Sequence, residues 1–164
     1  MNQISLDWDT VKRSYPTRPL IRPLAQFMKE IGGTPCCVQV SHALNAAGCL
    51  IPAHSNRRRT SSITTSLGTR KYLLAVDEMK WFLEDNFGMG DELTSNGSGA
   101  PRPSRADMMQ TLSDRTGILV FMKGPYGLHT ELWDVDHMHQ RDISPAVFDA
   151  PHVYFWDVMI TAMA

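Results

Sequence analysis

The sequence contains few cysteines, almost no net charge and no long apolar run. Three cysteines in 164 residues are too few for a disulfide framework. A net charge of −1 gives no overall attraction to nucleic acid or to an anionic membrane surface. No stretch approaches the ~18 apolar residues of a membrane helix, and the opening MNQISLDWDTVKRSYPTRP holds no apolar core of an export signal. These absences exclude a disulfide-rich or membrane-inserted protein and predict synthesis in a reducing cytoplasm without a signal peptide.

The order of the expected elements predicts a single α+β domain over residues 1–164. With 43% hydrophobic residues, the chain has enough apolar surface for a sizeable core. Helical patterns come first, at 24–31, 34–48, 71–88 and 106–117, the last ending at Gly117. Segments typical of strands follow, at 117–121, 129–135 and 152–160. Helices followed by strands favour helices packed against a mainly antiparallel sheet.

The segment TPCCVQVSHALNAAG, residues 34–48, places two adjacent cysteines at the head of a helix. Thr34 suits the N-cap, Pro35 the first helical position and Gly48 the stop. Cys36 and Cys37 then lie in the first turn, where unpaired N–H groups and the helix dipole stabilise a thiolate. The thiolate is the reactive form of cysteine, so this segment is a candidate nucleophile site.

Helical phase separates the two cysteines. At about 100° per residue, Cys36 lies within an apolar arc and Cys37 at its edge, and the arc is completed by Val40, Ala43, Leu44 and Ala47. The opposite side carries Ser41, His42 and Asn45. Cys36 is therefore expected to face the body of the domain. From this segment alone, packing, a redox pair and a nucleophile all remain open, although adjacent cysteines lack the spacing of a CxxC redox motif.

A cysteine nucleophile requires a base within hydrogen-bond reach. Among six histidines, His129 is the best candidate, because it begins the strand-like HTELWDV beside the apolar GILVF segment. His42 projects from the polar side of the cysteine helix and His54 lies in a polar loop. Taken alone, a strand histidine such as His129 is more often a hydrogen-bonded structural residue than a catalytic base.

Two clusters of charged residues are interpreted as solvent-exposed segments. DVDHMHQRD, residues 134–142, has metal-binding residue types but no HExxH or CxxC companion, so it is interpreted as a solvated turn. No metal or cofactor is expected. The run Arg57–Arg59 is interpreted as a solvated loop, with contacts from Arg57 and Arg58 to substrate carboxylates as the alternative.

Several segments, in their order and spacing, resemble the type VI secretion amidase effectors of family 4. They are WDTVKRSYP, IGG, CCVQVSHALNAAGCLIP, KYLLAVDEMKWFLEDNFG, TGILVF, GLHTELW and VYFWDV. This family consists of NlpC/P60-like cysteine peptidases that cut peptidoglycan stem peptides. The resemblance implies a papain-like NlpC/P60-type α+β domain, with the cysteine helix packed on a mainly antiparallel sheet.

The resemblance assigns the family nucleophile to Cys36 and the family histidine to His129. The third catalytic residue, an aspartate after the LW pair, corresponds best to Asp142 if two residues are inserted in the turn, and otherwise to Asp136. Gln39 departs from the family, which usually has a basic residue three positions after the nucleophile.

The implied activity is cleavage of the D-glutamyl–meso-diaminopimelate bond by an antibacterial toxin acting in the periplasm of target bacteria. The implied partners are the stem peptide, a cognate immunity protein and the secretion apparatus, without nucleic acid or membrane insertion. Two other interpretations compete with this one. The first is a Cys-His transferase or deamidase of target-cell proteins, and the second is a non-catalytic periplasmic binding or immunity module in which Cys36 only packs.

Overall fold

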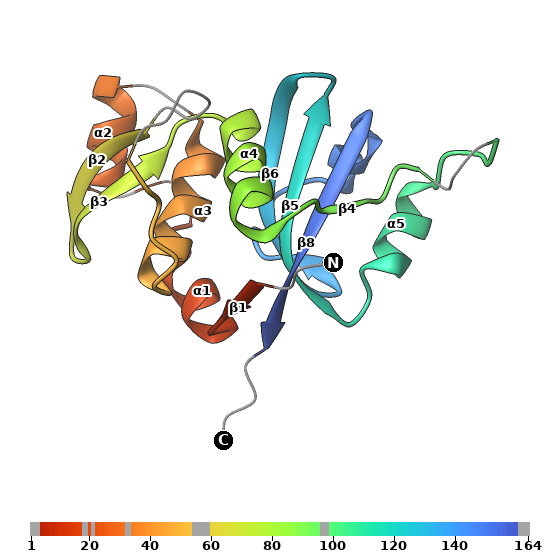
Figure 1. The fold of residues 1–164 in the computed structure, drawn as a ribbon, viewed down its shortest axis with the longest axis horizontal. Coiled ribbons are helices and arrows are strands. Elements are labelled where there is room, and N and C mark those ends of the chain that lie inside the picture. The colour runs from red at the N-terminus through yellow and green to blue at the C-terminus, as the bar shows by residue number, and fades with distance from the viewer. Residues whose placement is uncertain are drawn as a thin grey trace.

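The computed structural model describes residues 4–17, 20, 22–31, 34–53, 60–95 and 99–160, in which a helical half lies against a twisted sheet (Figure 1). The helices are α1 (Trp8–Ser14), α2 (Leu24–Ile31), α3 (Pro35–Ala46), α4 (Val76–Phe87) and α5 (Arg105–Thr111), followed by a short 3-10 helix at Pro145–Asp149. Helices α1, α3 and α4 pack on one face of the sheet, whereas α5 and the 3-10 helix pack on the other.

The main sheet has six strands, with the order β1-β8-β5-β6-β7 and with β4 paired to β8. Their bounds are β1 Ile4–Leu6, β4 Asp91–Glu92, β5 Arg115–Lys123, β6 Tyr126–Val135, β7 His137–Met138 and β8 His152–Ile160. All pairings are antiparallel except that of β1 with β8. A separate antiparallel hairpin joins β2 (Thr60–Thr65) and β3 (Gly68–Leu73). The prediction of an α+β fold with a mainly antiparallel sheet is confirmed.

The sequence of β5 is a nearly continuous apolar run because both faces of this strand are covered by helices. Ile118, Val120 and Met122 belong to the core beneath α1, α3 and α4. Leu119 and Phe121 point to the opposite face and belong to the core beneath α5 and the 3-10 helix. The sheet is therefore buried between two apolar layers, and β5 is its central strand.

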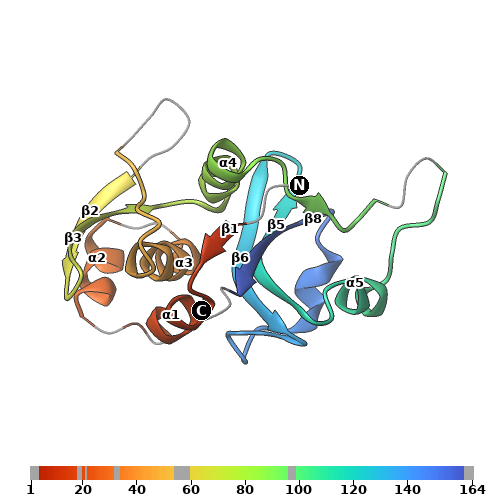
Figure 2. The same ribbon diagram turned by 60° about the horizontal axis from the view of Figure 1, so that its bottom comes forward.

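Helix α3 is buried on nearly all sides, which differs from the expected amphipathic helix. It lies between the sheet and the layer formed by α2 and the β2–β3 hairpin (Figure 2). Ser41 and Asn45 are buried because this hairpin uses their side chains: the Ser41 hydroxyl accepts the Leu73 N–H, and the Asn45 amide donates to the Lys71 carbonyl. The polar side of the helix thus contacts backbone rather than water.

One predicted helix boundary is wrong. The helix expected to end at Gly117 ends at Thr111, and Gly117 lies inside β5. A Cβ on Gly117 would stand 2.1 Å from the Trp156 carbonyl oxygen, so the glycine permits close strand packing rather than stopping a helix. The helical spacing within 71–88 begins at Val76 and stops at Gly88, in agreement with α4, and the residues before it form the end of β3. Within the described residues, no helix is long and apolar enough to cross a membrane.

Candidate active site

Cys36 is the second residue of α3, at the helix end that faces the sheet. Thr34 adopts the extended N-cap conformation, and its N–H donates to the Leu74 carbonyl at 2.9 Å, which ties the helix start to the end of β3. Pro35 occupies the first helical turn. N–H groups at this position have no partner within the helix, and the dipole is positive there. The local sequence therefore places the thiol where a helix favours negative charge.

The Cys36 sulfur is surrounded by groups that favour its thiolate. The hydrogen bond with the Cys37 side chain has the largest effect and lowers the pKa of Cys36, while burial acts in the opposite direction. The hydrogen bond and charge of His129 lower the pKa further, as does the backbone N–H of Thr130. The net result is a pKa well below the ordinary thiol value of 9.0, which is the signature of a reactive cysteine.

Cys37 has the opposite environment. Its side chain is fully buried, and burial raises its pKa well above 9.0. Negative charge on Cys36, Asp77 and Glu78 acts in the same direction. Cys37 therefore remains a thiol and acts as a hydrogen-bond donor toward Cys36.

His129 lies on β6, opposite Phe121 of β5, and hydrogen-bonds to Cys36. The Phe121 ring stacks on the imidazole, with centroids 6.1 Å apart and planes at 29°. Burial would lower the pKa of His129, but the hydrogen bonds and charges of Cys36 and Glu131 outweigh it and raise the pKa from 6.5 to about 9. The raised pKa of His129 and the lowered pKa of Cys36 are consistent with a thiolate–imidazolium pair.

The carboxylate beside His129 belongs to Glu131, which was not predicted as a site residue. Its Oε2 lies 3.3 Å from His129 Nε2, and its Oε1 accepts the Leu132 N–H at 2.9 Å. The Glu131 side chain has no exposed surface. Because successive strand residues alternate between faces, a residue two positions after His129 shares its face of β6. That alternation is the sequence signal that identifies Glu131.

The structure does not bring the two predicted acids to the imidazole. Asp142 is exposed in the turn after β7. Asp136 is also exposed, and its carboxylate bonds to His137 Nδ1 at 2.6 Å. Asp134 points to the α1 side of the sheet, where it accepts hydrogen bonds from Trp8 and Lys12.

Gln39 joins α3 to the segment after β7. Its amide Nε2 donates to the Gln140 Oε1 at 3.0 Å and to the Pro16 carbonyl at 2.7 Å. Its own Oε1 is buried and has no hydrogen-bond partner among the described residues. Both glutamine side chains are buried. Where the family usually has a cation, this chain thus has a neutral amide that fixes the loop carrying Gln140 against the cysteine helix.

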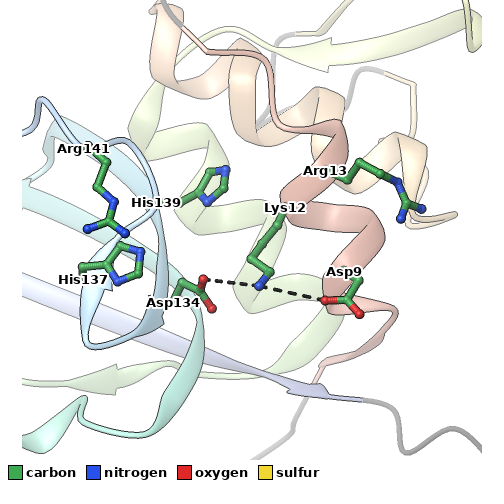
Figure 3. A pocket seen from close by; sticks show the side chains of 7 residues that line it. All are labelled: Asp9, Lys12, Arg13, Asp134, His137, His139 and Arg141. Carbon is green, nitrogen blue, oxygen red and sulfur yellow. Dashed lines mark hydrogen bonds and ion pairs between the residues drawn. The ribbon is translucent and has the colours of Figure 1, made fainter.

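A cavity of about 580 Å³ opens between α1 and the turn after β6 (Figure 3). Five basic side chains and two carboxylates line it: Asp9, Lys12, Arg13, Asp134, His137, His139 and Arg141. In Figure 3, Lys12 lies between the two acids, with its Nζ 3.3 Å from Asp134 and 3.9 Å from Asp9. Asp134, His137, His139 and Arg141 come from the strand and turn on one side of the cavity, whereas Asp9, Lys12 and Arg13 come from α1 on the other.

The cavity wall is connected to the cysteine helix. The His139 ring packs edge-on against the Tyr15 ring, with ring centroids 5.2 Å apart. The next residue, Gln140, hydrogen-bonds to Gln39. Gln39 lies three residues after Cys36 on α3, a rise of ~4.5 Å along the helix axis. Contacts through Gln140 and Gln39 thus link the cavity wall to the cysteine helix, although Cys36 and His129 do not themselves line the cavity.

Metal-binding residue types do not converge in the part of the chain that the structure describes: no group of three His, Cys, Asp or Glu side chains is placed to hold a metal ion. Arg57 and Arg58 lie outside the described residues, so their contact with substrate remains a prediction.

Solved structures with the same architecture are type VI effectors. Tae4 from Enterobacter cloacae is 16% identical, with a TM-score of 0.68 over 97% of this chain and 100% of that chain. The Tae4–Tai4 complex from Salmonella Typhimurium gives 18% identity and a TM-score of 0.62 over 96% and 100%. The Enterobacter cloacae Tae4–Tai4 complex gives 20% identity and a TM-score of 0.60 over 93% of this chain and 96% of that chain. A search of curated proteins gives no match.

These similarities, together with the buried cysteine helix against an antiparallel sheet, define an NlpC/P60-like α+β fold. The family model described as type VI secretion system (T6SS), amidase effector protein 4, matches residues 33–156. The chain belongs to this family, which confirms the resemblance. Membership makes it an amidase effector, and implies a peptidoglycan-degrading antibacterial toxin.

Proposed function

We propose that the chain is a cysteine amidase that hydrolyses the D-glutamyl–meso-diaminopimelate bond of peptidoglycan stem peptides. The observation that carries this proposal is the hydrogen-bonded pair of Cys36 and His129, at the head of α3, in a chain of the amidase effector family. The pair has the pKa directions of an activated nucleophile and its proton partner.

The reaction begins with attack of the Cys36 thiolate on the carbonyl carbon of the scissile amide. The negative charge that develops on the carbonyl oxygen is stabilised by the Cys36 backbone N–H and the positive end of the α3 dipole. His129, carrying the proton drawn from Cys36, donates it to the nitrogen of the leaving amine. The C–N bond breaks, and the acyl group remains on Cys36 as a thioester.

Water completes the cycle. Neutral His129 takes a proton from a water molecule, which attacks the thioester carbonyl. The C–S bond then breaks, the free carboxylic acid leaves, and Cys36 returns as a thiolate beside the imidazolium. The products are one new carboxylate and one new amine, as the hydrolysis of an amide requires.

The basic cavity supports an acidic substrate. In the stem peptide, D-glutamate is linked through its side-chain carboxyl, so its α-carboxylate stays free, and diaminopimelate carries a further carboxylate. Arg141 and the two cavity histidines offer nitrogen donors on the side of the cavity that faces α1. We infer that this cavity receives a carboxylate that flanks the scissile bond.

The solved relatives include effector–immunity complexes of Tae4 with Tai4. By analogy, the producing cell is expected to make an immunity protein that binds this chain. Delivery through the type VI apparatus places its action in the periplasm of target cells. We also infer that residues 1–164 form one amidase domain, because the solved relatives align along nearly the whole chain.

The test is digestion of purified peptidoglycan, followed by mass spectrometry of the muropeptides. The expected products end in D-glutamate and begin with diaminopimelate, and Cys36→Ala should yield none. Export of the wild-type chain to the periplasm should lyse Gram-negative cells, whereas cytoplasmic expression should be tolerated. Intact stem peptides after digestion, or equal toxicity in both compartments, would contradict the proposal.

A further inference from the structure

We propose that Glu131 is the positioning residue that orients His129, in place of an aspartate from the turn after β6. The proposal rests on the Cys36–His129 amidase function and assigns the third member of that site. It differs from the triad implied by the family resemblance, in which an aspartate follows the LW pair.

The first support is geometric. His129 and Glu131 alternate on one face of β6, and the carboxylate Oε2 lies 3.3 Å from His129 Nε2. An imidazole has two nitrogens, so Nδ1 is left to face the Cys36 sulfur. The carboxylate is itself fixed, because its other oxygen accepts the Leu132 backbone N–H at 2.9 Å. One oxygen thus anchors the side chain while the other sets the orientation of the ring.

The second support is burial. A carboxylate with no exposed surface is costly unless its charge is compensated. The hydrogen bonds to its oxygens come from His129 and from Leu132. Protonated His129 supplies a positive charge in direct contact with Glu131, and His139 lies within electrostatic reach of the same carboxylate. A buried Glu131 therefore favours the imidazolium, which in turn favours the thiolate of Cys36.

The third support comes from the turn, where neither aspartate takes this place. Asp142 is exposed, and Asp136 is 77% exposed and bonded to His137. The buried polar residue of the returning segment is Gln140, and its Oε1 is occupied by Gln39. The segment that supplies the family's acid has become a neutral contact with α3 in this chain.

The decisive experiment compares Glu131→Gln with Glu30→Gln, a matched change on the exposed side of α2. Glu131→Gln keeps the shape of the side chain and removes its charge. Its kcat on stem peptides should fall roughly 10²–10⁴-fold with little change in KM, the range expected when an imidazole loses its orienting acid. The alkaline limb of its pH profile should also move to lower pH, since His129 loses a group that raises its pKa.

Glu30→Gln should match the wild type in both measurements, and so should Asp142→Asn. Glu131→Asp, which retains the charge on a shorter stem, should recover part of the activity. A folded Glu131→Gln variant with wild-type kcat and pH profile would overturn the proposal. A large loss in Asp142→Asn would overturn it as well.

A measurement on the unmodified protein covers the case in which Glu131→Gln does not fold. Nitrogen NMR of the imidazoles should show His129 protonated on both nitrogens at neutral pH, with titration near pH 9. Titration near the ordinary value of 6.5 would overturn the role of Glu131. Failure of the amidase proposal would look different, because the wild type itself would then leave stem peptides intact.

Discussion

Gly127, at the start of β6, lies directly against Val76, at the start of α4. A Cβ on Gly127 would stand 2.4 Å from the Val76 Cβ and 2.8 Å from the Asp77 backbone nitrogen. Contacts this short are sterically forbidden, so this position of the strand admits only glycine. The contact sets the position of β6 beside the two helix N-termini, and His129 follows two residues later.

Gly127→Ala should therefore damage both the fold and the site. The added methyl pushes β6 away from α4, with a destabilisation of about 1–3 kcal/mol, and separates His129 from Cys36. Thermal unfolding and kcat on stem peptides measure the two effects. Gly124→Ala in the same hairpin is the control: its Cβ meets open space, although its φ of +59° strains an alanine. It should lower stability without a comparable loss of activity, and equal effects on kcat would contradict the positional role of Gly127.

The pH dependence of kcat/KM should be bell-shaped, with its alkaline limb set by His129. The raised pKa of His129 keeps the imidazole protonated up to about pH 9, so the proton for the leaving amine is present below that pH and lost above it. The acid limb reflects protonation of Cys36, whose pKa is held well below 9.0. Initial rates on a soluble stem peptide across this range test both limbs. A rate that climbs steadily through pH 9 would show that thiol ionisation, not His129, controls the reaction.

Cys37→Ala should weaken the nucleophile without removing it. The Cys37 thiol has the largest effect in lowering the pKa of Cys36, so its loss should raise that pKa and move the acid limb to higher pH. Alanine keeps the helix, and the small void should cost about 1 kcal/mol of stability. The ultraviolet absorbance of the thiolate as a function of pH measures the shift. Cys36→Ala, by contrast, should be inactive at every pH.

Arg141→Ala should discriminate between substrates that differ in one charge. If the cavity binds a stem-peptide carboxylate, KM should rise roughly tenfold, as expected for loss of a charged hydrogen bond. The wild type should also prefer a stem peptide with free D-glutamate over one whose α-carboxylate is amidated, and Arg141→Ala should lose that preference. Lys29→Ala, an exposed change on α2, provides the control. An unchanged preference in Arg141→Ala would exclude this carboxylate contact.

The main elements could be predicted from the sequence because their patterns are local. Cap residues predict the bounds of α3, and helical phase predicts that Cys36 faces the body of the domain. Apolar alternation predicts β6. The strands β1 and β4, with three and two residues, are too short for any periodicity to be visible. The local sequence predicts Gly117 as a helix stop. The structural need for glycine there is the close approach of the Trp156 carbonyl, a residue far along the chain.

The candidate site was predictable in part for the same reason. The structure brings Cys36 and His129 together, as the sequence indicated. The family resemblance predicts the orienting acid in the turn after β6 or beyond it, at Asp136 or Asp142. Strand alternation already put Glu131 beside His129, but no local pattern reveals that its carboxylate is buried and bonded to the ring. Burial of Glu131 depends on packing between elements far apart in the chain, which no local pattern encodes.

The parallel pairing of β1 with β8 joins the first described strand to the last, with Ile4 opposite Val158. During synthesis β1 leaves the ribosome long before its partner exists, and Cys36 likewise precedes the strand of His129. Contacts between residues so distant in the chain form late and make folding slow. A nascent chain thus carries its cysteine well before it has an imidazole to activate it. The order of synthesis itself delays the assembly of the cysteine site until β6 and β8 have been made.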